Sequence, residues 1–212
     1  FDVLGIEPDG LVSNKFTDMM KGYLSGSEIV NYHIYDYDGP GYLQDKEFKY
    51  NPWIVTLNHT DNAKSFIRNL FEKLDPLIDL DFNEMPSQEG SILNIYDTYA
   101  FEYLPDNDDL GMILHAPRDV QVTWLEWGSG DLLSGDYLDQ MDASTIVHEV
   151  GHALGLSHPY DDPNNVSWDS DDTVMSYNES SDGWDLFYSD ADIAALQSIW
   201  GVENDSYSRK YI

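Results

Sequence analysis

Residues 145–159 spell TIVHEVGHALGLSHP, and the predicted helix and metal site both depend on this stretch. His148 and His152 are four residues apart, so on a helix both side chains project from the same side and can bind one metal ion. Glu149 is expected on the flank of that helix. The apolar residues gather on the opposite side, namely Ile146, Val147, Val150 and Leu154. The stretch therefore predicts a helix with one face in the core and the other at a metal site.

The motif continues beyond the helix to a third histidine. Gly155 tolerates positive φ and can end the helix and turn the chain back, which would bring His158 beside the first two histidines. Three neutral imidazoles bind zinc and leave a fourth position open for water, as in catalytic zinc sites. Zinc lowers the pKa of a coordinated water to about 7, and Glu149 is placed to accept its proton. This pattern predicts a zinc-dependent endopeptidase, and the string is the extended motif named for metzincins.

The composition is strongly acidic but apolar enough for a core. Forty acidic and ten basic residues give a formal net charge of −30, which disfavours nucleic acid and anionic membrane surfaces as partners. Apolar residues make up 42% of the 212 residues, which suits one domain, and the absence of cysteine excludes disulfides. No apolar stretch approaches the roughly 18–20 residues that span a bilayer. The chain begins at Phe1 without a signal segment, which favours a mature or trimmed fragment.

Periodicity and chain-breaking residues predict the order of the elements. Asp61 is the expected N-cap of the second helix, and Ser189 with Asp192 resembles a capping box. The composition of residues 31–52, with aromatics among Asp, Gly and Pro, predicts irregular structure, and residues 159–172 are expected to form a polar loop. The predicted helices span about 13–25, 61–75, 142–154 and 190–200. The predicted strands span about 53–57, 80–85, 91–96, 111–115 and 120–127.

Two later segments add a resemblance to a known family. Residues 173–177 spell TVMSY, residues 192–201 spell DIAALQSIWG, and Pro159 directly follows the third histidine. Together with the zinc motif, these residues resemble the catalytic domain of the serralysin group of metzincins. The chain contains no Gly-Gly-x-Gly-x-Asp repeat, so it resembles that domain without the C-terminal calcium-binding β-roll.

The resemblance implies both a fold and an activity. The expected fold is α+β: a metzincin-type, two-lobed catalytic domain with a mixed five-stranded sheet, a long active-site helix and a C-terminal helix. Residues 1–212 would form one domain, with an upper lobe at about 1–157 and a lower lobe at about 158–212. Met175 would form the apolar floor beneath the zinc, and Tyr177 would be an additional zinc ligand that swings to stabilise the oxyanion. The implied protein is a secreted, monomeric protease of proteins or peptides, with a pro-segment or an inhibitor as further partners.

Substrate binding is expected at an edge strand, because an extended peptide can add to its exposed backbone groups. The candidate is residues 111–115, by their position before the zinc helix and by family analogy; they are Gly111, Met112, Ile113, Leu114 and His115. The alternative function is a zinc-bearing binding or adhesion module without catalysis. Such a module needs no base beside the metal, so the presence of Glu149 argues against it.

Two further groups of residues carry weaker signals. Calcium, which prefers six to eight oxygen ligands, could bind at either of two acidic loops. One loop contains Asp161, Asp162, Asp169, Asp171 and Asp172, and the other contains Asp106, Asp108 and Asp109. Solvated acidic loops without calcium are the alternative. His33, His59 and His115 are expected to be structural or exposed, with His115 closest to the cleft.

Overall fold

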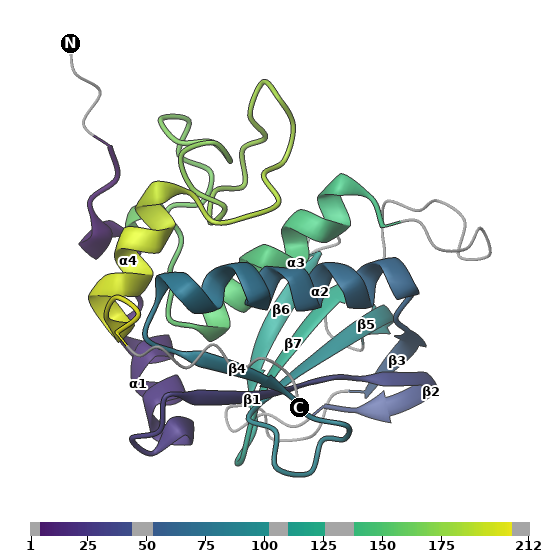
Figure 1. Cartoon of the computed structure of the whole chain (residues 1–212). Helices are drawn as coiled ribbons and strands as arrows, with labels where there is room; N and C mark the ends of the chain where they lie inside the picture. The colour runs from purple at the N-terminus through teal and green to yellow at the C-terminus, as the bar shows by residue number, and fades with distance from the viewer. Residues whose placement is uncertain (1–4, 44–52, 102–109, 126–137, 205–212) are drawn as a thin grey trace.

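The computed structural model describes residues 5–43, 53–101, 110–125 and 138–204, and it shows a mixed sheet with helices packed across one face (Figure 1). The α-helices are α1 (Asn14–Leu24), α2 (Asp61–Leu74), α3 (Gln140–Ala153) and α4 (Asp190–Trp200). The described residues also form short 3-10 helices, namely η1 (Pro8–Gly10), η2 (Asp75–Leu77) and η3 (Pro159–Asp161). The four predicted helices are thus present, and α4 has the predicted bounds.

The sheet has seven strands within the described residues, where five were expected. They are β1 (Ile29–Ile34), β2 (Asp36–Tyr42), β3 (Trp53–Asn58), β4 (Asp81–Glu84), β5 (Leu93–Phe101), β6 (Gly111–His115) and β7 (Val120–Leu125). Strands β4, β1, β5 and β7 are parallel neighbours in that order, and β6 pairs antiparallel with β7. The second half of β5 also pairs antiparallel with β3, which in turn pairs with β2. The sheet is therefore mixed, as predicted, but larger.

The two additional strands fall mainly within residues 31–52, a stretch that was wrongly predicted to be irregular, although β1 begins two residues before it. Strand β1 alternates between half-buried and buried residues, the pattern of a strand on a core. Strand β2 contains Gly39, Pro40 and Gly41, and its pairing with β3 shifts register before Gly39. Among the described residues β2 pairs only with β3, and an edge strand tolerates Pro and Gly that would disrupt a central one. Residues 44–52 of the same stretch lie outside the described residues.

Side-chain caps set where the helices begin. Thr60, not the predicted Asp61, is the N-cap of α2, because its hydroxyl accepts the backbone N–H of Ala63. Helix α3 begins two residues earlier than predicted, since the carboxylate of Asp139 accepts the N–H groups of the next turn. The capping box of Ser189 with Asp192 is present at the start of α4. These caps satisfy donors that the first helical turn leaves without partners.

Helix α3 is buried on all sides, and this burial positions the site. It packs on β6 and β7 of the sheet and also contacts α1 and α2. One large apolar cluster joins the sheet to the helices, including Val30, Ile67, Val122, Val147 and Leu196. The metal-site helix is thus held between the sheet and its neighbouring helices. The division of the chain into an upper and a lower lobe stays a prediction.

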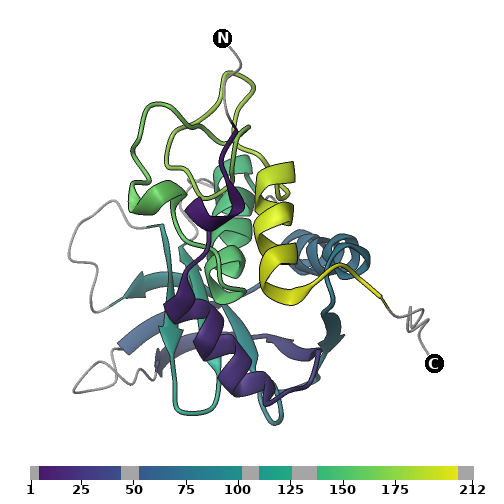
Figure 2. The same ribbon diagram turned by 90° about the vertical axis from the view of Figure 1, so that its left-hand side faces the viewer.

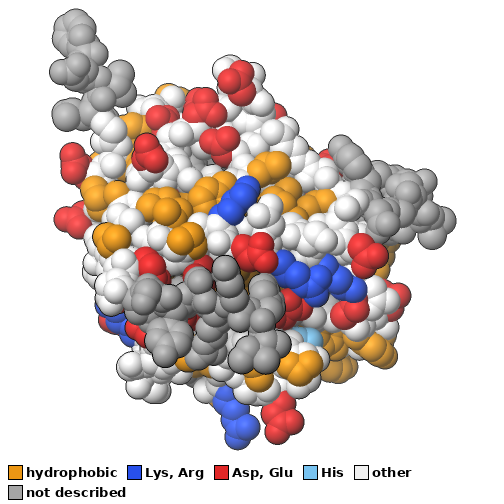
Figure 3. All heavy atoms as spheres, in the orientation of Figure 1, with side chains coloured by type: hydrophobic (Ala, Val, Ile, Leu, Met, Phe, Trp, Pro, Cys, Tyr) orange, Lys and Arg blue, Asp and Glu red, His pale blue; other side chains and the backbone are white. Residues whose placement is uncertain are grey.

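The surface view is consistent with the acidic composition. In Figure 3 acidic side chains are scattered over the visible face and outnumber the basic ones. No helix in the described parts of the chain combines the length and apolarity that crossing a bilayer requires.

Candidate metal centre

Helix α3 presents His148 and His152 one turn apart. Their ring centroids lie 4.7 Å apart, and both side chains are buried. The apolar side chains predicted for the opposite face are also buried: Ile146, Val147, Val150 and Leu154. Helical spacing thus separates a core face from a histidine face, as the sequence indicates.

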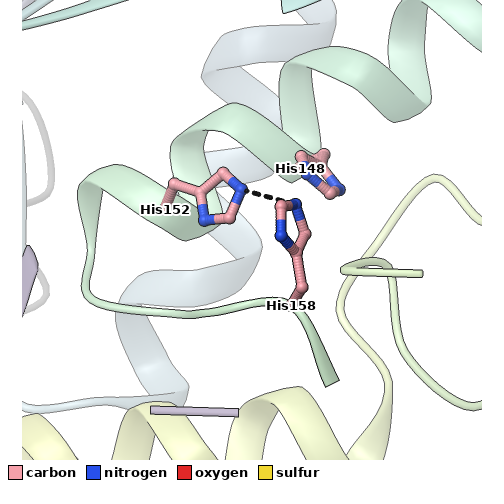
Figure 4. A group of neighbouring side chains, drawn as sticks. All are labelled: His148, His152 and His158. Atoms are coloured by element: carbon pink, nitrogen blue, oxygen red, sulfur yellow. Dashed lines mark hydrogen bonds between the residues drawn. The ribbon is translucent and has the colours of Figure 1, made fainter. Parts of the chain in front are cut away.

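The third histidine arrives through a sharp reversal after the helix. Gly155 has φ +109°, which favours glycine, and the N–H of Leu156 donates to the carbonyl of Gly151. The chain then runs back so that His158 faces α3 (Figure 4). The Nε2 atoms of His152 and His158 are 3.2 Å apart.

Backbone carbonyls orient two of the imidazoles. The Nδ1 of His148 lies 2.8 Å from the carbonyl oxygen of Val174, and the Nδ1 of His152 lies 2.9 Å from that of Leu156. Because a carbonyl oxygen only accepts, each Nδ1 carries the proton and each Nε2 keeps a lone pair. Burial lowers the pKa of His148 to about 4, with a further contribution from His158. Burial also holds the pKa of His152 well below its usual value, so both rings are neutral near pH 7.

The three histidines fit a metal ion. One ligand nitrogen from each of His148, His152 and His158 lies within 4.8 Å of the others, and no second such group occurs among the described residues. Tetrahedral zinc with bonds of about 2.0–2.1 Å to nitrogen separates its ligand atoms by roughly 3.4 Å, close to the observed spacing of His152 and His158. The Nε2 of His148 is buried and makes no hydrogen bond to a described residue. A buried lone pair of this kind is suited to a metal.

The segment that contains Met175 and Tyr177 contacts the histidine cluster. Met175 is fully buried, and a Cβ on Gly151 of α3 would lie 2.9 Å from its sulfur. The ring of Tyr177 is about half exposed, with its centroid 4.9 Å from that of His158 and 5.4 Å from that of His148. The structure therefore brings Tyr177 to the histidine cluster and leaves Met175 in the core.

Asp192 supports this segment in a way that the sequence did not reveal beyond its capping role. Its carboxylate accepts hydrogen bonds from the hydroxyl of Thr173 and from the backbone N–H of Val174. It also accepts the N–H of Ser189 at the start of α4. Because the carbonyl of Val174 orients His148, Asp192 links α4 to the metal site through one residue. The capping box and the family-like segment at residues 192–201 were the sequence signals for this residue, and neither indicates its bonds to Thr173 and Val174.

Glu149 is buried beside the first residue of β6. A Cβ on Gly111 would lie 2.7 Å from the Cγ of Glu149 and 2.9 Å from its Oε1, so a glycine there allows the strand to approach the carboxylate closely. The structure thus places the predicted base between the histidine pair and the start of the predicted substrate strand. Among the described residues strand β6 pairs only with β7, so its other edge has no strand partner there.

A pocket of about 320 Å³ opens beside His148 and Glu149. Glu149 is the only Asp, Glu, Lys or Arg among the described residues that line it. The others are mostly apolar or uncharged, and they include Leu110, Met141, Thr145, Val174, Tyr177 and Trp184. The pocket therefore suits an uncharged side chain next to the histidine cluster.

The other histidines considered, His33, His59 and His115, are not part of the metal-binding group. His115 is buried and stacks on Phe16, with ring centroids 5.7 Å apart. His33 contacts the carbonyl of Met85, and His59 accepts the indole N–H of Trp124. These contacts agree with structural roles for the three histidines.

Among the described residues, no group of three or more acidic side chains lies close enough together to bind a calcium ion. In one acidic loop the carboxylate of Asp169 accepts the N–H of Asp171, and that of Asp172 accepts the N–H of Asp169. These carboxylates therefore stabilise local turns. The second loop, with Asp106, Asp108 and Asp109, lies outside the described residues, so calcium binding stays a prediction.

Comparisons with known proteins find serralysins and a plant protease. No protein-family model matches the chain. A serralysin of Photorhabdus laumondii is 35% identical over 129 residues, covering 50% of this chain and 25% of that protein. Serralysin C of Dickeya chrysanthemi is 32% identical over 125 residues, covering 50% of this chain and 24% of that protein. Metalloendoproteinase 1 of Glycine max is 31% identical over 118 residues, covering 48% and 36%. The chain thus spans about a quarter of the length of the serralysins that it matches.

Proposed function

We propose that the chain is a serralysin-like metzincin catalytic domain and acts as a secreted zinc-dependent endopeptidase. The names of the similar proteins support a metalloprotease, and the histidine cluster supports a bound metal. Zinc is proposed because three neutral imidazoles suit it. Secretion is proposed by analogy with the serralysins.

His148, His152 and His158 would hold the ion. Zinc, when bound, supplies a Lewis acid and lowers the pKa of a coordinated water to about 7. The carbonyls of Val174 and Leu156 keep the first two imidazoles in the required tautomer. Such support from groups behind the ligands tunes both the affinity and the geometry of a metal site.

Glu149 would act as the general base. Glu149 is the residue after His148 in α3, and both residues line the same pocket. From there it can accept a proton from the attacking water and later deliver that proton to the leaving amine of the cleaved peptide. The surrounding burial excludes competing solvent, which strengthens the electrostatic interactions of the carboxylate.

Tyr177 would be a further ligand that also stabilises the oxyanion. Its ring is half exposed at the edge of the histidine cluster, so it has room to move. A phenol hydroxyl that donates a hydrogen bond to the developing oxyanion acts mainly in the transition state. This role separates Tyr177 from Met175, whose full burial suits packing alone.

An extended peptide substrate would add to the edge of β6 that has no strand partner among the described residues. Gly111 lies beside Glu149, so a peptide paired along this strand would pass the proposed base. The adjacent pocket would receive one uncharged side chain of the substrate. Of the residues in β6, Leu114 and His115 are buried, so we assign their side chains to packing.

The observation that carries the proposal is that nitrogens of His148, His152 and His158 lie within 4.8 Å of one another, and that His148 lines the same pocket as Glu149. The test is digestion of casein by the wild-type chain and by Glu149→Gln, each with and without a chelator. We expect Glu149→Gln to bind zinc and fold normally but to lose several orders of magnitude in turnover. Glu72→Gln, the same change at an exposed position of α2, is the matched control and should retain activity.

Near-normal turnover by Glu149→Gln would exclude this mechanism. Zinc binding by the wild-type chain without any chelator-sensitive cleavage would instead indicate the alternative, a binding or adhesion module that keeps the fold.

A further inference from the structure

Residues 7–13, here called the strap, lie against the segment that carries the third histidine. The strap contains η1, which contacts both η3 and α4. Figure 2 shows this purple segment running between the green loop that follows α3 and the yellow helix α4. The strap is far from residues 155–161 in the sequence, so tertiary packing alone brings the two together.

Backbone pairing joins the strap to the turn after α3. Val12 and Leu156 form an antiparallel β-bridge, in which the N–H of Ser13 donates to the carbonyl of Gly155 at 2.8 Å. The N–H of Ser157 donates to the carbonyl of Leu11 at 2.7 Å. The carbonyl of Leu156 is not used in this bridge and instead accepts the Nδ1–H of His152. The strap thus fixes the residue whose carbonyl orients a metal-site histidine.

A side-chain contact joins the strap to the residues that follow His158 in the chain. Tyr160 has φ +50° and Asp161 has φ +61°, a conformation that residues other than glycine rarely adopt. Such strain persists only where surrounding contacts hold it. The ring of Tyr160 lies directly on Gly10, where an added Cβ would be 2.6 Å from its Cε1, and its hydroxyl accepts the N–H of Glu7 at 3.4 Å. The strap therefore contacts the chain both before and after His158.

Helix α1, which follows the strap, adds two contacts to the same turn. A Cβ on Gly155 would lie 2.6 Å from the hydroxyl oxygen of Thr17. The ring of Phe16 meets the ring of His152 edge-on, with centroids 5.4 Å apart. Helix α1 therefore packs against both the turn at Gly155 and the second histidine, His152.

We propose that the strap is a positioning element for the third metal ligand, acting through the contact of Gly10 with Tyr160. The inference rests on the proposed metal site. Helix α3 holds His148 and His152 by its own hydrogen bonds, whereas His158 lies on a non-helical segment. The position of His158 therefore depends on what packs against that segment, and a preorganised ligand binds metal more tightly than a mobile one.

The test substitutes Gly10→Ala in the full chain and measures the zinc dissociation constant by competition with a chromophoric chelator. The new methyl group would overlap the Tyr160 ring and displace it. We expect about a 10-fold increase in the dissociation constant, the lower end of the 10–100-fold range seen when groups behind metal ligands are removed. Gly5→Ala is the matched control, because a Cβ there has no atom within 4 Å, and it should bind zinc as the wild type does.

A second variant keeps the inference testable if Gly10→Ala folds poorly. Tyr160 is 53% exposed, so Tyr160→Ala should fold, and it should weaken zinc binding to a similar extent. In the Tyr160→Ala background, Gly10→Ala should have no further effect, because the ring that it displaces is gone. The absorption spectrum of bound Co²⁺ should change in both single variants, which reports ligand geometry directly.

Wild-type zinc affinity in Gly10→Ala or in Tyr160→Ala would overturn the inference, even if their thermal stability fell. Additive effects in the double variant would overturn it as well. These results would leave the proposed function intact. Failure of the wild-type chain to bind zinc would instead refute the metal site on which both rest.

Discussion

Gly111→Ala should disable the proposed base without touching a metal ligand. The substitution adds one methyl group where β6 begins. That methyl would lie 2.7 Å from the Cγ of Glu149 and 2.9 Å from the Cγ2 of Thr145. Both neighbours belong to α3, which is packed on several sides and has little room to retreat. The side chain of Glu149 must therefore move.

The structure sets the size of the effect. Ordinary contact begins at 3.4 Å, so Glu149 must shift by roughly 0.7 Å or more to accept the methyl group. Misplacement of a catalytic group by about 1 Å can cost about 10²-fold in rate. We therefore expect kcat to fall by about 10²-fold, which corresponds to roughly 2.7 kcal/mol. Overpacking should also lower the free energy of unfolding by about 1–3 kcal/mol.

The assay is steady-state cleavage of a fluorogenic peptide, together with zinc content and thermal unfolding. Gly41→Ala is the matched control, since a Cβ at that strand glycine would meet only Ile54 at 3.9 Å. In a Glu149→Gln background, Gly111→Ala should change the residual rate little, because the group that it displaces is already inactive. Wild-type kcat in Gly111→Ala, or an equal loss in both backgrounds, would refute the reasoning.

Two further predictions concern Tyr177 and His59. Tyr177→Phe should retain zinc and lower kcat by about 10²–10³-fold with little change in KM. This is the typical cost of removing one hydrogen-bond donor to the oxyanion. A wild-type kcat in this variant would exclude oxyanion stabilisation by Tyr177. Burial lowers the pKa of His59 to about 4, from 6.5 in an unfolded chain. Between these two pH values the unfolded state binds a proton at His59 that the folded state does not bind. The free energy of unfolding is therefore highest above pH 6.5 and decreases as the pH falls towards 4. Urea unfolding should show a slope of up to about 1.4 kcal/mol per pH unit from this group, and His59→Gln should reduce that slope.

Local geometry explains what could be predicted from the sequence. The i, i+4 spacing of His148 and His152 predicts one shared face, because backbone hydrogen bonds set the pitch of any helix. Gly155 indicates the reversal, since few other residues adopt its φ of +109°. Helix α4 has its predicted bounds because the capping box at Ser189 and the glycine at position 201 both act within one turn of its ends.

Strand β2 shows where composition misleads. Its Gly39, Pro40 and Gly41 are typical of turns, yet pairing with β3 on one side is enough to keep the segment extended. An edge strand needs hydrogen bonds on one side only, and its residues need not alternate between core and solvent. The signal for β2 is therefore in its partner strand rather than in its own residues.

Helix α3, its two histidines and the turn towards the third could be predicted, because each follows from interactions within a few residues. The approach of β6 to Glu149, the support of Val174 by Asp192 and the contact of Gly10 with the ring of Tyr160 could not be predicted in this way. Each of these contacts joins segments that are distant in the chain. Their positions depend on how the whole core packs, so no single stretch of sequence contains the information.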